Sequence, residues 1–161
     1  MKLIISTLFL VTIFPLSSFC ETATDAQLLC PTLEHISGES KNICDTSGNS
    51  FIVLEFFSAS CPHCKRNVEP FKKLEEKVKG LAYSRLISIN NLVAAKNFAQ
   101  QQNISTDMAI DPSGIAQRAY RITKVPSIFV LNQNQNIIYR HYGVLNENDI
   151  EAIYNLVKRT K

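Results

Sequence analysis

The chain has 161 residues, of which 45% are hydrophobic, and its formal net charge is +3. A chain of this length and composition can bury one compact hydrophobic core but is short for two domains that each have a core of their own, so we expect a single domain. The small net charge gives no indication of a nucleic-acid partner or of a strongly charged substrate.

The N-terminus has the pattern of a secretory signal peptide. Lys2 precedes an apolar run over residues 3–14, and Pro15 and small serines follow it. The apolar run is too short to span a bilayer comfortably. We expect a signal peptide over residues 1–20, cleaved after Cys20; the alternatives are lipidation of Cys20 and a buried N-terminal helix.

Two stretches with very different patterns follow. Residues 21–50 form an N-terminal extension that is rich in turn-forming residues from position 25 onward, which predicts a short helix and an irregular strand. Residues 51–58, FIVLEFFS, are an almost continuous run of aromatic and β-branched residues, interrupted only by Glu55. Such a run is typical of a strand that is covered on both faces.

A helix is predicted directly after this strand. Cys61 and Cys64 stand at its start, and beyond them apolar residues recur at helical spacing up to Lys79, with Gly80 as a stop. The unit is therefore a strand, a turn and a helix, with both cysteines at the turn.

The rest of the chain alternates between strands and helices. We expect a strand over residues 81–90, a helix over 92–102, a turn at 111–114 with a short helix ending near Tyr120, a β-hairpin with strands at 127–131 and 137–142, and a closing helix from Asn146. This alternation predicts an α/β layer architecture.

The order of these elements resembles the thioredoxin fold, a central mixed β-sheet flanked by helices, over residues 51–161. LEFFSASCPHC at positions 54–64 resembles the active-site stretch of DsbA-type proteins, and the sequence from 109 to 143 resembles the TlpA, ResA and DsbE group. The chain has no room between Asn90 and Asp107 for the helical insertion of DsbA-type proteins. The resemblance implies a periplasmic thiol:disulfide oxidoreductase that acts on exported protein thiols or disulfides, is recycled by a membrane redox partner, and needs no cofactor or metal.

Cys61 and Cys64 form a C-x-x-C pair. At a helix N-terminus, free backbone N–H groups and the helix dipole stabilise a thiolate at Cys61. Pro62 fits the first turn because it lacks an N–H, and a protonated His63 adds positive charge and a hydrogen bond to sulfur. We expect these effects to lower the pKa of Cys61 and expect Cys64 to be the shielded, resolving thiol. The alternative for His63 is a solvated residue without a special role.

Glu55 lies six residues before Cys61 inside the apolar strand, where thioredoxins have a buried acid. Burial raises the pKa of a carboxyl without partners, which allows it to exchange protons with Cys64. The alternative is a carboxylate that faces a solvent channel and pairs with a lysine.

Val125 and Pro126 precede the predicted hairpin. The resemblance implies that the peptide bond between them is cis, that the proline faces the C-x-x-C pair, and that Val125 pairs with the substrate backbone. A proline at the first residue of a strand is otherwise only a permitted position.

Cys30 and Cys44 flank a turn-rich loop without C-x-x-C spacing. If Cys20 leaves with the signal peptide, four of the five cysteines remain. An even number in an exported protein favours disulfides, so we expect a structural disulfide between Cys30 and Cys44. The alternative is a relay, in which one of them exchanges with the C-x-x-C pair.

Three classes of function fit these residues. The first is a thiol:disulfide oxidoreductase. The stabilised thiolate of Cys61 favours oxidation or isomerisation of clients. The TlpA-like sequence from 109 to 143 favours the opposite direction, reduction of clients, for example in cytochrome c maturation. The second is a metal-binding thiol protein, in which the C-x-x-C pair and some of Cys30, Cys44 or His63 hold zinc or copper(I). The third is a redox-inactive binding module of the same shape.

Overall fold

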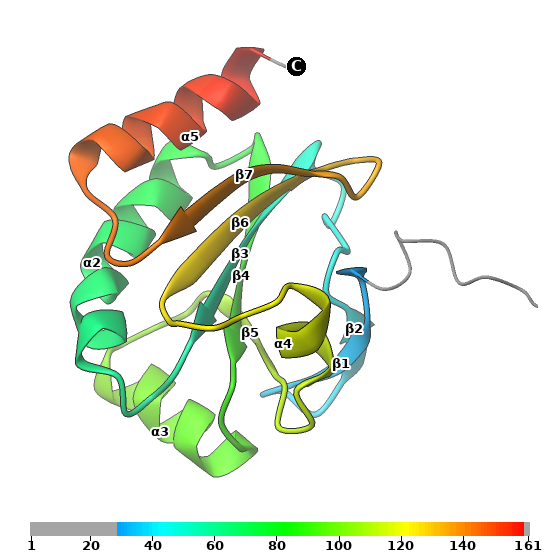
Figure 1. Ribbon diagram of the computed structural model, residues 1–161, viewed down its shortest axis with the longest axis vertical. Helices are drawn as coiled ribbons and strands as arrows, with labels where there is room; N and C mark the ends of the chain where they lie inside the picture. The colour runs from blue at the N-terminus through cyan, green and yellow to red at the C-terminus, as the bar shows by residue number, and fades with distance from the viewer. Residues whose placement is uncertain (1–28, 160–161) are drawn as a thin grey trace, which may run out of the picture.

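The computed structural model describes residues 29–159, so the predicted signal peptide lies outside the described residues. A seven-stranded mixed sheet runs through this part of the chain in the order β2-β1-β5-β4-β3-β6-β7, with helices on both faces (Figure 1). The elements in chain order are β1 (Thr32–His35), β2 (Ser40–Asn42), β3 (Phe51–Phe57), α2 (Pro62–Lys77), β4 (Ala82–Ser88), α3 (Leu92–Gln101), β5 (Asp107–Ile110), α4 (Ile115–Ala119), β6 (Ser127–Asn132), β7 (Ile137–Tyr142) and α5 (Glu147–Arg159). None of the described helices is long and apolar enough to cross a membrane.

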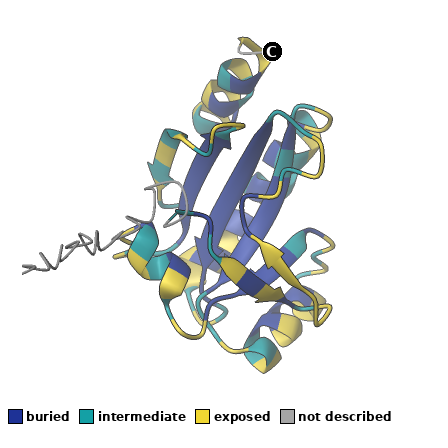
Figure 2. Cartoon of the chain, turned by 90° about the vertical axis from the view of Figure 1, so that its right-hand side faces the viewer, coloured by how far each residue is buried: buried dark blue, intermediate teal, exposed yellow. Residues whose placement is uncertain are grey.

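Strand β3 lies inside the sheet, because β4 pairs with it in parallel and β6 pairs with it antiparallel. All of its residues are buried, as the continuous apolar run predicted, and the sheet forms the dark interior of Figure 2. Its side chains alternate between the two faces. Phe51, Val53 and Phe57 lie in the hydrophobic core between the sheet and helices α2, α3 and α5. Ile52, Leu54 and Phe56 lie in the core on the other face, which α4 covers. By this alternation Glu55 points toward α2.

The two long helices begin as the sequence predicted. Helix α2 has Cys61 as its N-cap and ends at Lys77, slightly before the predicted end. Helix α5 is preceded by Asn146, whose side-chain oxygen accepts hydrogen bonds from the backbone N–H groups of Asn148 at 2.8 Å and Asp149 at 3.2 Å. These hydrogen bonds satisfy N–H groups that have no partner within the helix.

The N-terminal extension differs from its prediction. In place of the predicted irregular strand, β1 and β2 form an antiparallel hairpin, and β1 pairs with β5. Leu29 is helical, and the residues before it, where the predicted short helix would continue, lie outside the described residues. The extension is therefore part of the same sheet as residues 51–159. Cys30 and Cys44 enclose the hairpin and are joined by a disulfide with a Cα–Cα distance of 5.3 Å. Since their sulfurs are bonded to each other, they are not thiolate ligands for a metal.

A buried charged cluster fixes this hairpin to the sheet. Asp107 Oδ1 lies 2.7 Å from His35 Nδ1, and Asp107 Oδ2 accepts hydrogen bonds from Arg85 Nε at 2.7 Å and from the Tyr83 hydroxyl at 3.1 Å. Arg85 also donates to the carbonyl oxygen of Asn42 in β2 at 2.8 Å. Burial raises the pKa of Asp107, but the hydrogen bonds and charges of Arg85 and His35 outweigh it and hold the pKa below its usual range.

Replacing both Cys30 and Cys44 with serine is expected to lower the free energy of unfolding by about 3 kcal/mol, because the disulfide restricts the unfolded chain. The bond joins residues 14 positions apart. Urea unfolding measures the loss when both proteins also carry serine at Cys61 and Cys64, so that no other disulfide contributes. An unchanged midpoint would show that strand pairing and the Asp107 cluster hold the hairpin without the bond.

Candidate active site

Cys61 lies where the central strand passes into α2. Its Sγ accepts a hydrogen bond from the backbone N–H of Cys64 at 3.4 Å, and Pro62 occupies the first helical position. Partial burial raises the pKa of Cys61. The hydrogen bonds from the backbone and side chain of Cys64 and from the backbone of His63, together with the positive charge of Arg66, outweigh burial, and the pKa is lowered. Cys61 is half-buried, so its sulfur is the one that a client can reach.

Cys64 is only 1% exposed and packs in the core between α2 and the sheet. Burial raises the pKa of its thiol to about 12, although the hydrogen bond from the backbone N–H of Ser58 acts in the opposite direction. The neighbouring Cys61 and Glu55 raise it further. The two sulfurs are therefore chemically unequal: Cys61 is ready to act as a nucleophile, whereas Cys64 needs a base.

The imidazole of His63 contacts Arg66 and not the Cys61 sulfur. Arg66 Nη2 lies 2.8 Å from His63 Nδ1, and because a guanidinium only donates, Nδ1 must be the acceptor. No hydrogen bond joins the imidazole to the sulfur in the described chain, so that prediction was wrong. The charge that lowers the pKa of Cys61 is that of Arg66. Sequence reasoning missed Arg66, although its place one turn after His63 was visible.

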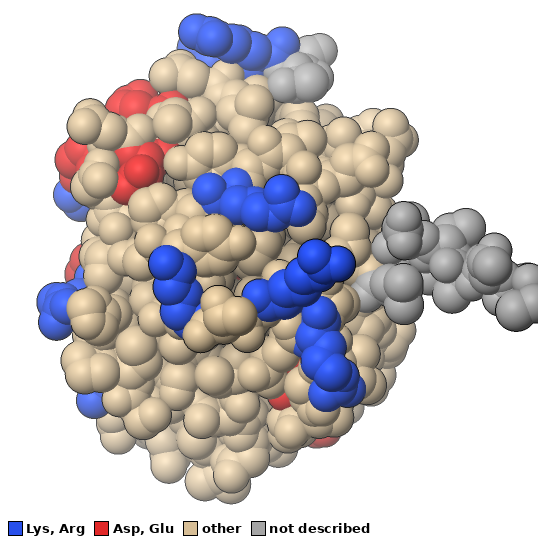
Figure 3. All heavy atoms as spheres, viewed as in Figure 1, with Lys and Arg blue, Asp and Glu red and all other residues tan. Residues whose placement is uncertain are grey.

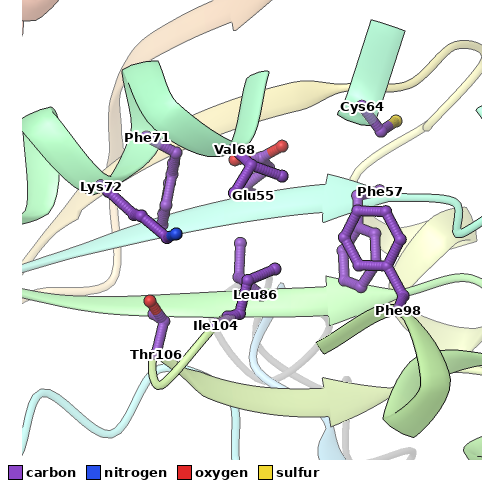
Figure 4. A pocket seen from close by; sticks show the side chains of 10 residues that line it. All are labelled: Glu55, Phe57, Cys64, Val68, Phe71, Lys72, Leu86, Phe98, Ile104 and Thr106. Carbon is purple, nitrogen blue, oxygen red and sulfur yellow. The ribbon is translucent and has the colours of Figure 1, made fainter. Parts of the chain in front are cut away.

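Glu55 is 3% exposed and points from β3 toward α2, on the same side of the sheet as Cys64 (Figure 4). Burial raises the pKa of Glu55 to about 8, and the side-chain amide of Asn67 partly opposes this effect. At neutral pH the carboxyl therefore holds a proton. No ion pair involves Glu55 within residues 29–159, so the alternative of a lysine-paired carboxylate was wrong.

A small cavity connects this carboxyl with the buried thiol. Its walls include Glu55, Cys64, Phe57 and Phe98, and Lys72 lies at its far end (Figure 4). The cavity leaves about 10 Å³ for the centre of a water molecule, which is room for one water at most. A proton can pass between Glu55 and Cys64 across such a gap through a single bridging water.

Asn67 is fully buried one turn after Cys64 and is a second residue that sequence reasoning missed. Its Oδ1 accepts a hydrogen bond from the backbone N–H of Leu145 at 2.7 Å, which ties α2 to the segment before α5. Its Nδ2 approaches Glu55 without reaching hydrogen-bond geometry. The signal in the sequence is a polar residue at a core-facing position of an amphipathic helix.

The segment before β6 lies against the cysteine turn. The Val125–Pro126 peptide bond is cis, as the resemblance implied. The Cys61 thiol donates to the carbonyl oxygen of Val125, with 3.6 Å between sulfur and oxygen. The segment therefore lies beside the sulfur of Cys61.

A helix that begins at a C-x-x-C pair beside a cis-proline, with one activated and accessible thiol and one buried thiol, has the chemistry of a thiol-disulfide oxidoreductase. The protein is an enzyme of that class, and its substrates are protein thiols and disulfides. The chain belongs to the Redoxin family, whose family model matches residues 22–157.

Individual relatives agree with this assignment. The chain is 26% identical over 128 residues to the thiol-disulfide oxidoreductase ResA of Halalkalibacterium halodurans, which covers 78% of this chain and 72% of the relative. It is 24% identical over 122 residues to the sporulation thiol-disulfide oxidoreductase A of Bacillus subtilis, covering 73% and 71% of the two chains. The function is thus thiol-disulfide exchange, in agreement with the names of these relatives.

Solved structures show the same thioredoxin-like fold. StoA from Bacillus subtilis superposes with a TM-score of 0.66 at 18% identity, covering 81% of this chain and 97% of that one. A putative thiol:disulfide interchange protein DsbE from Chlorobium tepidum gives a TM-score of 0.69 at 22% identity, covering 81% and 92%.

Proposed function

We propose that the protein oxidises or isomerises the thiols of exported client proteins through Cys61 and Cys64. The observation that supports this direction is the unequal pair, in which the pKa of Cys61 is lowered and that of Cys64 is raised. A stabilised thiolate makes the disulfide easier to reduce and the protein more oxidising. Reduction of clients is the second candidate, and the TlpA-like sequence from 109 to 143 favours it.

In the proposed reaction a client thiolate attacks Cys61 Sγ in the Cys61–Cys64 disulfide. The bond between the two enzyme sulfurs breaks, and Cys64 leaves as a thiolate that takes a proton from Glu55. A second client thiolate then attacks the client sulfur of the mixed disulfide and releases the Cys61 thiolate. The client gains a disulfide, and the enzyme is left as a dithiol that another protein must reoxidise.

Val125, Pro126 and Pro62 are the proposed substrate-binding residues. The contact between the Cys61 thiol and the Val125 carbonyl supports this proposal, because it brings Val125 and Pro126 next to the sulfur that a client would attack. An extended client segment could pair with Val125 there, because β6 begins only at Ser127.

We also propose that the protein is exported to the periplasm, with residues 1–20 as a signal peptide, or anchored through a lipidated Cys20. A membrane protein would then recycle the pair. The apolar N-terminus and the Cys30–Cys44 disulfide support export, because disulfides persist in oxidising compartments. A structurally similar protein of Mycobacterium tuberculosis, with a TM-score of 0.66 at 14% identity over 82% of this chain and 97% of that one, is a secreted disulfide oxidoreductase.

The equilibrium redox potential of the pair against glutathione tests the proposed direction. In the mature protein without residues 1–20, a Cys30→Ser, Cys44→Ser variant leaves only Cys61 and Cys64 to respond. A potential above roughly −200 mV is expected for an oxidase or isomerase, whereas thioredoxin lies near −270 mV. A thioredoxin-like value would contradict oxidation and assign the protein to the reduction of clients.

Replacing Arg66 with glutamine is expected to raise the pKa of Cys61 and to make the potential more negative, because the charge that stabilises the thiolate is lost. The pH dependence of alkylation by iodoacetamide measures the thiolate. His63→Ala is the matched control, since it removes the imidazole but keeps the backbone N–H that bonds to the sulfur. If His63→Ala changes the pKa of Cys61 more than Arg66→Gln does, the assignment of the charge to Arg66 is wrong.

A further inference from the structure

The charge of this protein is unevenly distributed. Between Asp111 and Glu147 the chain has no acidic residue, and its basic residues there are Arg118, Arg121, Lys124 and Arg140. These residues belong to α4, to the segment before β6 and to β7. Figure 3 shows blue side chains spread across this face with no red ones between them, while acidic side chains gather at the start of α5.

Among the described residues, these four basic side chains have no acidic partners. Lys72, Lys73 and Lys77 of α2 are different, because glutamates of α2 and α5 pair with them. In the described part of the chain none of the four makes an ion pair; Arg118 donates to a backbone carbonyl, and Lys124 Nζ lies 5.0 Å from the centre of the Tyr142 ring. Their charge is therefore available to a partner.

A groove of about 680 Å³ crosses the same face. Arg121 and Arg140 line it, and Ala119, Ile137 and Tyr142 give it an apolar surface. Tyr142 is 45% exposed, so its ring is accessible to a molecule that lies in the groove. We call this feature the basic groove.

One end of the basic groove adjoins the segment that contacts Cys61. Tyr142 pairs with Ser127 across β6 and β7, directly after Pro126. The next residue, Gly143, donates its backbone N–H to the carbonyl oxygen of Pro126 at 2.9 Å. A chain lying in the groove thus leads to the segment that contacts Cys61.

We infer that the basic groove binds an acidic segment of the client or redox partner whose sulfur exchanges with Cys61. This inference rests on the proposed function. Unpaired positive charges raise the association rate of a negatively charged partner, and an arginine can hold a carboxylate through two parallel hydrogen bonds. A concave, partly apolar site suits a peptide chain, whereas a membrane surface is flat.

Two dithiol peptides test this inference, identical except that one has a tail of glutamates and the other a tail of glutamines. The protein with both disulfides closed oxidises each peptide, and alkylation followed by mass spectrometry gives the rates. At low ionic strength the glutamate peptide is expected to react on the order of tenfold faster. The advantage should disappear at high salt, because the charges are then screened.

The variant Arg121→Ser, Arg140→Ser is expected to lose the preference for the glutamate peptide. The glutamate tail also changes the reactivity of the peptide's own thiols. Comparing the ratio of the two peptide rates between variant and parent cancels this effect. Arg121→Lys with Arg140→Lys should keep the preference, and so should Lys158→Ser with Arg159→Ser, which removes the same charge at the far end of α5.

Dithiothreitol, a neutral dithiol, separates this inference from the proposed function. If the protein fails to oxidise dithiothreitol, the proposed function fails. If dithiothreitol reacts but the parent shows no preference between the peptides, or the Arg121→Ser, Arg140→Ser variant keeps it, the inference is overturned. Binding to phosphatidylglycerol vesicles that depends on Arg121 and Arg140, without any peptide preference, would also overturn it and assign the groove to a membrane surface.

Discussion

Replacing Cys61 with serine is expected to lower the rate of thiol-disulfide exchange by more than roughly a thousandfold, equivalent to about 4 kcal/mol in the activation barrier. Only a thiolate attacks a disulfide effectively, and Cys64 cannot substitute because it is 1% exposed and its pKa is raised to about 12. Oxidation of a dithiol peptide, followed by alkylation, measures the loss.

Cys64→Ser should behave differently, since Cys61 can still form a mixed disulfide that nothing inside the protein resolves. Non-reducing gels should then show covalent complexes with client proteins. Cys30→Ser with Cys44→Ser is the control and should keep the exchange activity. If that double variant lost activity in the folded protein, the disulfide would be part of a relay; complexes formed by Cys61→Ser instead of Cys64→Ser would reverse the assigned roles.

Replacing Glu55 with glutamine is expected to remove a large pH dependence of stability. Burial raises the pKa of Glu55 from its ordinary 4.5 to about 8, so between these values the folded protein keeps a proton that the unfolded chain has released. The stabilisation is complete below pH 4.5 and is lost as the pH rises toward 8. The difference between the two pKa values corresponds to a stabilisation of the folded protein by about 5 kcal/mol in total.

Urea unfolding of parent and Glu55→Gln at several pH values tests this expectation. Between roughly pH 5.5 and 8 the parent should lose about 3 kcal/mol more than the variant. Glu55→Gln should also slow the step in which Cys64 gains or loses its proton, with the pH dependence of that step altered. Parallel stability curves for the two proteins would mean that Glu55 ionises normally in the fold, which excludes it as the proton donor.

The sequence predicted those parts of the protein whose pattern is local. The continuous apolar run of β3, the helix after Cys61 and the hairpin after Pro126 each carry their own signal. The β1–β2 hairpin does not, because its strands have only four and three residues and are held by β5 and by a disulfide. Strands this short depend on tertiary pairing, which local propensity does not reveal.

The catalytic centre was also predicted only where its signal is local. The C-x-x-C spacing marks Cys61 and Cys64, and Glu55 stands out as a charged residue in an apolar run. The contact of Arg66 with His63 depends on a side-chain conformation, and the role of Asn67 depends on Leu145, 78 positions away in the sequence. Nothing near His35 indicates its contact with Asp107, 72 positions further along.

The cavity between Glu55 and Cys64 also determines where the protons of the reaction come from. Both groups are nearly fully buried, and the space between them has room for one water at most. A phosphate or imidazole molecule from the medium cannot enter it. At constant pH the turnover of the enzyme should therefore be insensitive to buffer concentration, since the protein brings its own acid into the complex with each client.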